Sequence, residues 1–312
     1  MSRPPLILDC DPGHDDALAI MLAASRANLV AITAVSGNAP LERTLVNALL
    51  TAQIAGIDVE VHEGAAKPLL GEAQHAPYIH GQTGLDGPVL PPLSKAASKV
   101  PAVKAILAAA EQHDDLWLVP VGPLTNVAIA LTLEPSLAKR LAGISIMGGA
   151  YGPGNTTAAA EFNIWADPEA AQVVFESGAN LILAGLDVTH QFRMNAARVA
   201  RLRAAGGTAA TFAADLLTFF SAAYLKHTGQ AGGGPLHDPC AVLAVTDPQL
   251  FTSSRRHVAV ETAGKLTRGM TVVDRRGDLS KPANTTVLET INADAAFDVL
   301  FDAVTALDGG AK

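Results

Sequence analysis

The stretch PLILDCDPGHDDALAIMLAAS at residues 5–25 decides the fold class. It opens with Pro5–Leu8, an apolar run of strand length, and continues into the acidic turn Asp9–Asp15. The Ala- and Leu-rich segment Asp16–Ser25 follows, with the length and composition of a helix. A buried strand, a polar turn and a helix in this order predict the first unit of an α/β sheet.

The same order recurs further along the chain. The predicted strands are 29–35, 116–120, 144–147 and 181–186, and the predicted helices between and after them are 41–55, 124–133 and 167–177. The last third predicts helices at 208–225, after Asp238 and at 294–307, and strands at 257–261, 271–273 and 286–291. Alternation of this kind predicts an open, mostly parallel sheet. No linker separates two parts, so residues 1–312 are expected to form one domain.

Composition excludes several function classes. A hydrophobic content of 49% with only 17% charged residues excludes a disordered chain. The net charge of -8 and the absence of a basic stripe argue against a nucleic-acid partner. No run reaches the roughly 18 uninterrupted apolar residues of a membrane helix. Two cysteines are too few for a disulfide scaffold, so the expected setting is the cytoplasm.

Ligands of open α/β sheets bind at the carboxyl ends of the strands. The segments expected at that edge are Asp9–Asp16, Ser36–Asn38, Val121–Gly122, Met147–Gly149 and Asp187. Long loops at 65–92, 148–161 and 229–237 are expected to be functional. Chemistry should therefore be sought at this edge.

Four carboxylates crowd the end of the first strand: Asp9, Asp11, Asp15 and Asp16. Helix capping explains one or two of them, because Asp is favoured at the start of a helix. It does not explain four, because like charges this close repel unless a cation or a proton lies between them. All-oxygen ligation suits a hard cation, Ca²⁺ or Mg²⁺.

Further polar groups follow later strands and loops. His237-Asp238-Pro239 is either a helix start or a part of the site, whereas the Asp-Pro pairs at Asp167 and Asp247 are interpreted as helix starts only. Four other residues could line a polar cup around a polyhydroxy ligand, and these are Asn38, Asn155, Glu161 and Asn163.

Taken together, these residues resemble a known family. Residues 9–17, DCDPGHDDA, are similar to the N-terminal signature of the inosine-uridine preferring nucleoside hydrolases. Later blocks resemble that family in the same order, and they are 36–38 (SGN), 119–126 (VPVGPLTN), 147–149 (MGG), 160–164 (AEFNI) and 237–239 (HDP). The resemblance covers essentially the whole chain. It implies a Rossmann-like single domain with helices on both faces of the sheet.

The resemblance also implies a Ca²⁺-dependent hydrolase that splits ribonucleosides into base and ribose, commonly as a homotetramer or dimer. Calcium would be held by Asp11, Asp16, Asp238 and the main-chain carbonyl of Val121. Asp11 would also act as general base, and His237 is the candidate acid. The ribose would contact Asp15, Asn38, Met147, Asn155, Glu161 and Asn163. The base would lie near His80, and Tyr224 and His227 are further candidates for the base end.

Two alternatives stay open at this point. The first is a Mg²⁺-dependent aspartyl-phosphate phosphatase, with Asp9-x-Asp11 as its nucleophile motif and imitations of later motifs at Ser145, Gly277-Asp278 and Lys281. It leaves Asp15 and Asp16 unexplained. The second is a nucleoside sensor without activity, although a pure binder of ribose has no need of a water-activating metal cluster.

Overall fold

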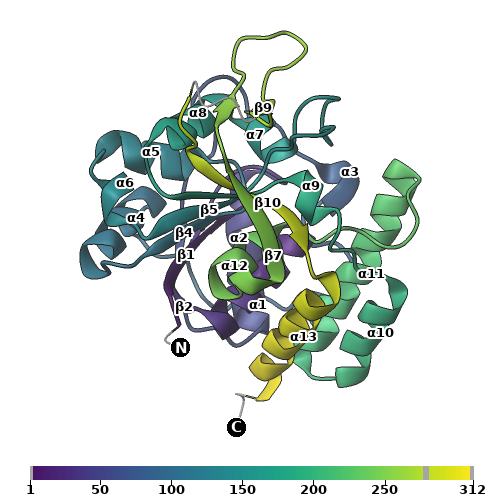
Figure 1. The fold of residues 1–312 in the computed structure, drawn as a ribbon. Helices are drawn as coiled ribbons and strands as arrows, with labels where there is room; N and C mark the ends of the chain where they lie inside the picture. Colours follow the sequence, from purple (N-terminus) through teal and green to yellow (C-terminus); the bar gives the residue numbers. More distant parts are fainter. Residues whose placement is uncertain (1–2, 277–280, 310–312) are drawn as a thin grey trace.

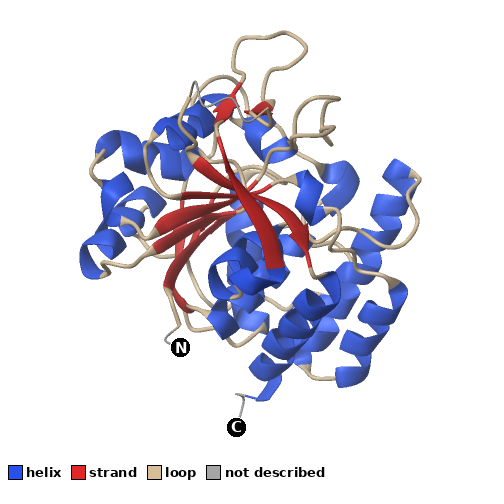
Figure 2. Cartoon of the chain, in the orientation of Figure 1, coloured by secondary structure: helices blue, strands red, loops and turns tan. Residues whose placement is uncertain are grey.

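The computed structural model describes residues 3–276 and 281–309, and its centre is an eight-stranded sheet (Figures 1 and 2). In spatial order the strands are β3 (Val61–Glu63), β2 (Asn28–Ala34), β1 (Pro5–Cys10), β4 (Trp117–Pro120), β5 (Gly143–Met147), β6 (Leu181–Ala184), β10 (Thr285–Ile291) and β7 (Phe251–Arg256). Every neighbouring pair is parallel except β10 and β7. The predicted α/β class with a mostly parallel sheet is confirmed.

Helices cover both faces of the sheet, because the strands are apolar on both sides. In β1, Leu6 and Leu8 belong to one buried cluster, while Ile7 between them belongs to the other. The first cluster is completed by α1 (His14–Arg26), α2 (Leu41–Ile54), α10 (Ala196–Ala205), α11 (Thr208–Thr228), α12 (Asp238–Thr246) and α13 (Ala293–Gly309). The second is completed by α4 (Ala102–Gln112), α5 (Thr125–Leu133), α6 (Leu137–Arg140) and α8 (Pro168–Glu176).

The remaining elements are short. They are α3 (Pro77–His80), α7 (Phe162–Ala166), α9 (Leu186–Thr189), the 3₁₀ turn η1 (Pro248–Leu250) and the antiparallel pair β8 (Val258–Val260) and β9 (Thr271–Val273). The chain order changes direction between β1 and β4, which are neighbours in the sheet. This is a topological switch point, where open α/β sheets bind their ligands.

Several elements lie outside the predicted ones. The sequence patterns predicted neither the strands β3 and β7 nor the helices α4 and α10. The strand β7, with the sequence FTSSRR, is a polar edge strand, so it lacks the apolar run of a buried parallel strand. Asp167 caps α8 as predicted. Asp247 is the N-cap residue of η1, so the predicted helix start is confirmed, although its carboxylate pairs with Arg26 at 2.6 Å and makes no capping hydrogen bond within the described residues.

Within the described residues one helix, α11, has the length and apolarity of a membrane-crossing segment. Half of its most apolar 18-residue stretch is buried inside the molecule, where the helix packs against α10 and α13 (Figure 1). A core helix of a globular protein can have the same length and apolarity, so this feature does not by itself point to a membrane.

Candidate active site

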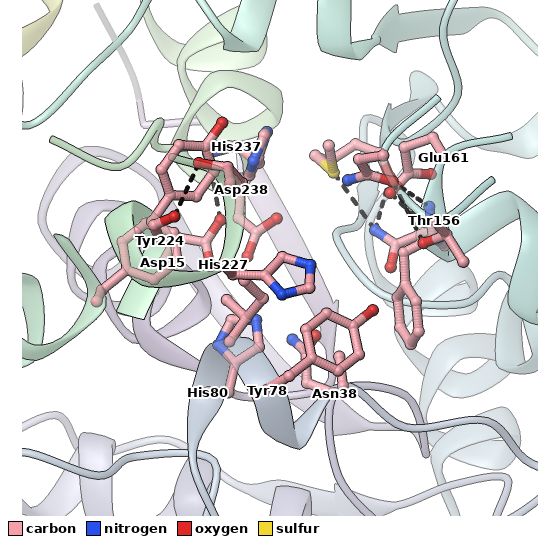
Figure 3. A pocket seen from close by; sticks show the side chains of 18 of the residues that line it. Asp15, Asn38, Tyr78, His80, Thr156, Glu161, Tyr224, His227, His237 and Asp238 are labelled. Atoms are coloured by element: carbon pink, nitrogen blue, oxygen red, sulfur yellow. Dashed lines mark hydrogen bonds between the residues drawn. The ribbon is translucent and has the colours of Figure 1, made fainter. Parts of the chain in front are cut away.

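A cavity of about 360 Å³ opens at the carboxyl edge of the sheet (Figure 3). Its volume is in the range of small-molecule sites. The residues predicted for ribose, base and acid all line it, namely Asp15, Asn38, His80, Met147, Asn155, Glu161, Asn163, Tyr224, His227 and His237. Val121 and Asp238 line it too, while Asp11 and Asp16 lie behind this lining, fully buried. The structure thus brings the sequence-predicted residues to one place.

Three carboxylates meet at one end of the cavity. Ligand oxygens of Asp15, Asp16 and Asp238 lie within 4.8 Å of one another. Asp16 is held by the main chain, since the amides of Asp11 and Gly13 donate to its two oxygens at 3.1 and 2.9 Å. The structure therefore puts Asp15, predicted to bind ribose, inside the acidic cluster, and Asp11 next to it.

Burial disfavours the ionised forms of these carboxylates unless a cation lies between them. It raises the pKa of Asp15 to about 7 and those of Asp11 and Asp238 well above their usual range, and the neighbouring carboxylates raise all three further. The Asp11 Oδ1 atom is buried and has no hydrogen-bond partner among the residues that the structure describes. Oxygen donors that repel one another around an unsatisfied carboxylate fit a divalent metal ion.

Two glycines make room for the Asp11 carboxylate. A Cβ on Gly122 would lie 2.5 Å from Asp11 Oδ1, and a Cβ on Gly37 would overlap Oδ2. The amide of Asn38, next to Gly37, donates to the same Oδ2 at 2.6 Å. The turns after β2 and β4 therefore close tightly around Asp11 because they contain glycine.

Asp9 has a different place from the other three acids of its motif. Its Oδ1 accepts hydrogen bonds from Thr33 at 2.6 Å and from Asn126 at 2.7 Å, and it does not line the cavity. These bonds tie β1 to β2 and to the first turn of α5. The Asp9 carboxylate is a structural link beneath the site, outside the acidic cluster of Asp15, Asp16 and Asp238.

The opposite wall carries the amides and Glu161. Asn163 Nδ2 donates to the carbonyls of Val121 at 2.7 Å and Met147 at 3.2 Å, which fixes the side chain at the ends of β4 and β5. Glu161 precedes α7 and caps it, accepting from the amides of Asn163 and Ile164 at 3.0 and 3.2 Å. Both side chains are thus positioned before any ligand arrives.

Burial raises the pKa of Glu161 to about 7, against the hydrogen bonds of its cap. The folded protein then holds this proton more tightly than the unfolded chain does, so the free energy of unfolding should fall between pH 5 and pH 7. In Glu161→Gln this contribution, about 2 kcal/mol over that range, should disappear. Denaturant unfolding at both pH values measures it.

Glu169→Gln provides a matched control for that experiment. Glu169 pairs with Arg268 at 2.7 Å, which lowers its pKa from the ordinary 4.5, so it is ionised in the folded and the unfolded protein above pH 5 and its replacement should leave the slope between pH 5 and pH 7 nearly unchanged. An unchanged slope in Glu161→Gln would show that Glu161 is ionised throughout this range.

Several histidines also line the cavity, and one of them, His237, lies beside the acidic cluster, where its main-chain amide donates to Asp15 Oδ2 at 3.2 Å. His237 Nδ1 lies 2.7 Å from the Thr189 hydroxyl, and burial with His190 and Arg193 nearby lowers the pKa of His237 to about 3. Burial also lowers the pKa of His80 well below its usual range. Both imidazoles are neutral in the ligand-free protein at neutral pH, so the predicted acid His237 would need substrate binding to change its environment.

Some lining residues were not predicted. They include Tyr78, His190, Phe220 and Gln230. Two signals could have found them: Tyr78 lies two positions before His80, and Phe220 lies one helical turn before Tyr224, on the same face of α11. Asp187, expected at this edge, does not line the cavity and instead accepts the Tyr151 amide at 2.8 Å.

Comparisons with known proteins identify the family of this chain. The family model of the inosine-uridine preferring nucleoside hydrolases matches residues 6–298. The pyrimidine-specific ribonucleoside hydrolase RihB of Escherichia coli O1:K1 / APEC is 44% identical over 297 residues, which cover 94% of this chain and 95% of that protein. RihA of Enterobacter sp. (strain 638), with the same description, is 44% identical over 300 residues, covering 95% of this chain and 96% of that protein.

Among solved structures, the purine-preferring ribonucleoside hydrolase from Gardnerella vaginalis superposes with a TM-score of 0.91 at 32% identity, covering 97% of this chain and 99% of that one. Fold, cavity and relatives define the class, which is that of enzymes splitting the N-glycosidic bond of ribonucleosides. The chain belongs to the inosine-uridine preferring nucleoside hydrolase family. The predicted family, enzyme class and nucleoside substrate are confirmed.

The two alternatives are set aside by this result. The phosphatase interpretation also fails at Ser145, whose buried hydroxyl donates to the Ala241 carbonyl at 2.7 Å. Gly277 and Asp278, its other motif residues, lie outside the described residues. The sensor interpretation has no support among relatives that are named as hydrolases.

Proposed function

We propose that this enzyme is a Ca²⁺-dependent hydrolase that prefers pyrimidine ribonucleosides. The observation that carries the proposal is one cavity that combines a buried acidic cluster, fixed amides and neutral histidines. Support for a pyrimidine preference comes from the two relatives at 44% identity, both named pyrimidine-specific. The Gardnerella enzyme, named purine-preferring, is 32% identical.

The proposed ion ligands are Asp11, Asp16, Asp238 and the Val121 carbonyl, with Asp15 shared between ion and ribose. A bound hard cation lowers the pKa of water and orients hydroxyl groups. Asp11 takes a proton from the water that attacks the anomeric carbon, as the bond from that carbon to the base nitrogen breaks. The sugar then develops positive charge, which the carboxylates of Asp15 and Glu161 stabilise.

The departing base gains negative charge and needs a proton, for which His237 is the proposed donor. Because water attacks directly and no side chain forms a bond to the sugar, the configuration at the anomeric carbon should invert. NMR of the first-formed ribose tests this point, and retained configuration would contradict the mechanism.

The main test is release of reducing sugar from a panel of purine and pyrimidine ribonucleosides, with and without a calcium chelator. We expect uridine and cytidine to be cleaved faster than inosine and adenosine, and the chelator to stop all cleavage. No release from any nucleoside by folded protein with calcium present would overturn the proposal. A purine preference would overturn only its pyrimidine part.

Asn163→Ala should lower kcat/KM for the ribonucleoside more than it lowers the affinity for the ion. Asn163 Nδ2 already donates to two main-chain carbonyls. Its Oδ1 makes no hydrogen bond within the described residues and can therefore accept one from a sugar hydroxyl. We expect kcat/KM to fall on the order of 10- to 100-fold, with a smaller change in calcium affinity measured by calorimetry. Asn180→Ala, at an exposed amide that also bonds a carbonyl, is the control. A larger loss of calcium affinity than of kcat/KM would place Asn163 among the ion ligands.

We also propose that the enzyme works in the cytoplasm as a homo-oligomer, a tetramer or dimer. Two buried free cysteines suit a reducing compartment. Exposed apolar side chains such as Leu70, Leu133 and Leu266 offer surface for subunit contacts. Light scattering coupled to size-exclusion chromatography measures the subunit number, and a monomer at micromolar concentration would contradict the oligomer.

A further inference from the structure

Gln230 lines the cavity, and the proposed reaction gives it no role. It lies in the glycine-rich loop 229–237, which joins α11 to α12. The segment around Arg193 pairs with this loop as a short antiparallel ladder, in which the Met194 amide donates to the Gly234 carbonyl at 2.9 Å. The loop therefore has a defined path beside the cavity.

The side chain of Arg193 ties the same loop. Its Nη2 donates to the carbonyl of Gly233 at 2.6 Å and to that of Ala231 at 3.4 Å. A Cβ on Gly233 would overlap the Met194 carbonyl oxygen, so this close approach requires glycine. The guanidinium also lies over the ring of Tyr224, 5.4 Å from its centroid, within the range of a cation–π contact. Arg193 is thus fixed by contacts with the loop and with α11.

Two groups face the side-chain oxygen of Gln230. The Tyr224 hydroxyl lies 3.2 Å from Gln230 Oε1, and Arg193 Nη1 lies 3.4 Å from it (Figure 3 labels Tyr224). A hydroxyl can face either end of an amide, because it both donates and accepts. A guanidinium has only donors and carries a positive charge, so it favours the oxygen over the NH₂ group. Arg193 therefore decides which end of the Gln230 amide points towards it.

The NH₂ group of Gln230 is left for a ligand. Gln230 Nε2 makes no hydrogen bond within the described residues, and the side chain is exposed at the cavity. Such a group donates two hydrogen bonds and accepts none. Tyr224 is a candidate for the base end of the site, so the partner of this donor should be an acceptor on the base. Pyrimidine bases offer carbonyl oxygens as acceptors.

We propose that Gln230 is a specificity-determining residue whose Nε2 donates to a carbonyl oxygen of a pyrimidine base, and that Arg193 is the positioning residue that fixes this orientation. The proposal rests on the proposed nucleoside hydrolysis and deepens it by naming a group that recognises the base. The departing base gains negative charge, part of which reaches its carbonyl oxygens, so this donor helps the base to leave as well as to bind.

The test replaces the donor and the base oxygen separately. Gln230→Glu keeps an oxygen for Arg193 and Tyr224 but has no NH₂ group. The analogues 2-thiouridine and 4-thiouridine each carry sulfur, a weaker acceptor, in place of one carbonyl oxygen of uridine. We expect Gln230→Glu to lower kcat/KM for uridine about tenfold, and to lower it much less for the one thiouridine in which the contacted oxygen is already absent.

Arg193→Met tests the positioning role, because methionine keeps an apolar contact with the ring beneath it but has no donor. The Gln230 amide can then turn, so the difference in kcat/KM between uridine and that same thiouridine should shrink, as it does in Gln230→Glu. Arg201→Met is the matched control, since Arg201 also lies over an aromatic ring, at 4.1 Å, and pairs with Asp298 at 2.6 Å, but does not line the cavity. It should keep the wild-type ratio between the two substrates.

Equal losses with uridine and both thiouridines in Gln230→Glu would overturn the proposal, because a merely structural role affects all three substrates alike. A wild-type ratio in Arg193→Met would overturn the positioning role of Arg193. If Arg193→Met does not fold, Arg193→Lys takes its place, because a single ammonium group lacks the fork of donors. Failure of the proposed function would be seen separately, as absence of turnover by the wild type, and the same comparison is then made with dissociation constants from calorimetry.

Discussion

Replacing Asp11 by asparagine is expected to lower kcat about 1000-fold or more while the fold survives. The carboxylate is fully buried. In the described part of the chain its Oδ1 has no hydrogen-bond partner, and its Oδ2 accepts only from the Asn38 amide. An asparagine oxygen can accept the same hydrogen bond from the Asn38 amide, so the variant keeps this local contact. It cannot take a proton from water, and it is a weaker ligand for a hard cation.

The stability of the variant distinguishes a functional acid from a structural one. The pKa of Asp11 is raised by burial and by Asp16, so its ionised form destabilises the metal-free fold. The free energy of unfolding of metal-free Asp11→Asn should therefore stay the same or rise, as measured by denaturant titration. Asp247→Asn is the opposite control, since it weakens the pair with Arg26 far from the cavity and should lower stability without lowering kcat. An Asp11→Asn enzyme that is fully active or unfolded would contradict the role of Asp11.

The sequence predicted most of the parallel sheet because each strand from β1 to β6, apart from β3, is a short apolar run with a turn behind it. It could not predict β7, since a polar edge strand depends on pairing with β10 at a distant place in the chain. The helix α10, with the sequence AARVARLRAA, buries only Leu202, so its apolar face is too narrow to give a clear period.

For the site, motifs at strand ends located most of the lining, because parallel strands end at one edge. The sequence could not separate the four acids of residues 9–16. The environment of each carboxylate depends on the strand that lies beside it. Asp9, for example, accepts a hydrogen bond from Thr33 of β2. The contact between the Nδ1 atoms of His14 and His80, at 3.2 Å, joins positions that are 66 residues apart, so the sequence does not show it.

Removal of the bound ion is expected to abolish turnover and to destabilise the fold. The ligand oxygens of Asp15, Asp16 and Asp238 lie within 4.8 Å of one another, so without a cation they repel or hold protons. At a calcium concentration 100 times its dissociation constant, binding should stabilise the fold by about 2.7 kcal/mol. Calcium should restore activity better than magnesium, because carboxylate clusters of variable geometry suit its 6–8 ligands, about as many as this site can offer with water.

The pH dependence of ion binding gives a second, independent readout. Because the pKa of Asp15 is raised to about 7, the metal-free site holds protons at neutral pH, and the ion must displace them. Calcium affinity should therefore increase from pH 6 to pH 8, with proton release visible in calorimetry when buffers of different ionisation enthalpy are compared. Full activity after elemental analysis has shown the metal to be absent would exclude this role of the acidic cluster. A pH-independent affinity would mean that the carboxylates are already ionised before the ion arrives, and that their repulsion is balanced within the protein.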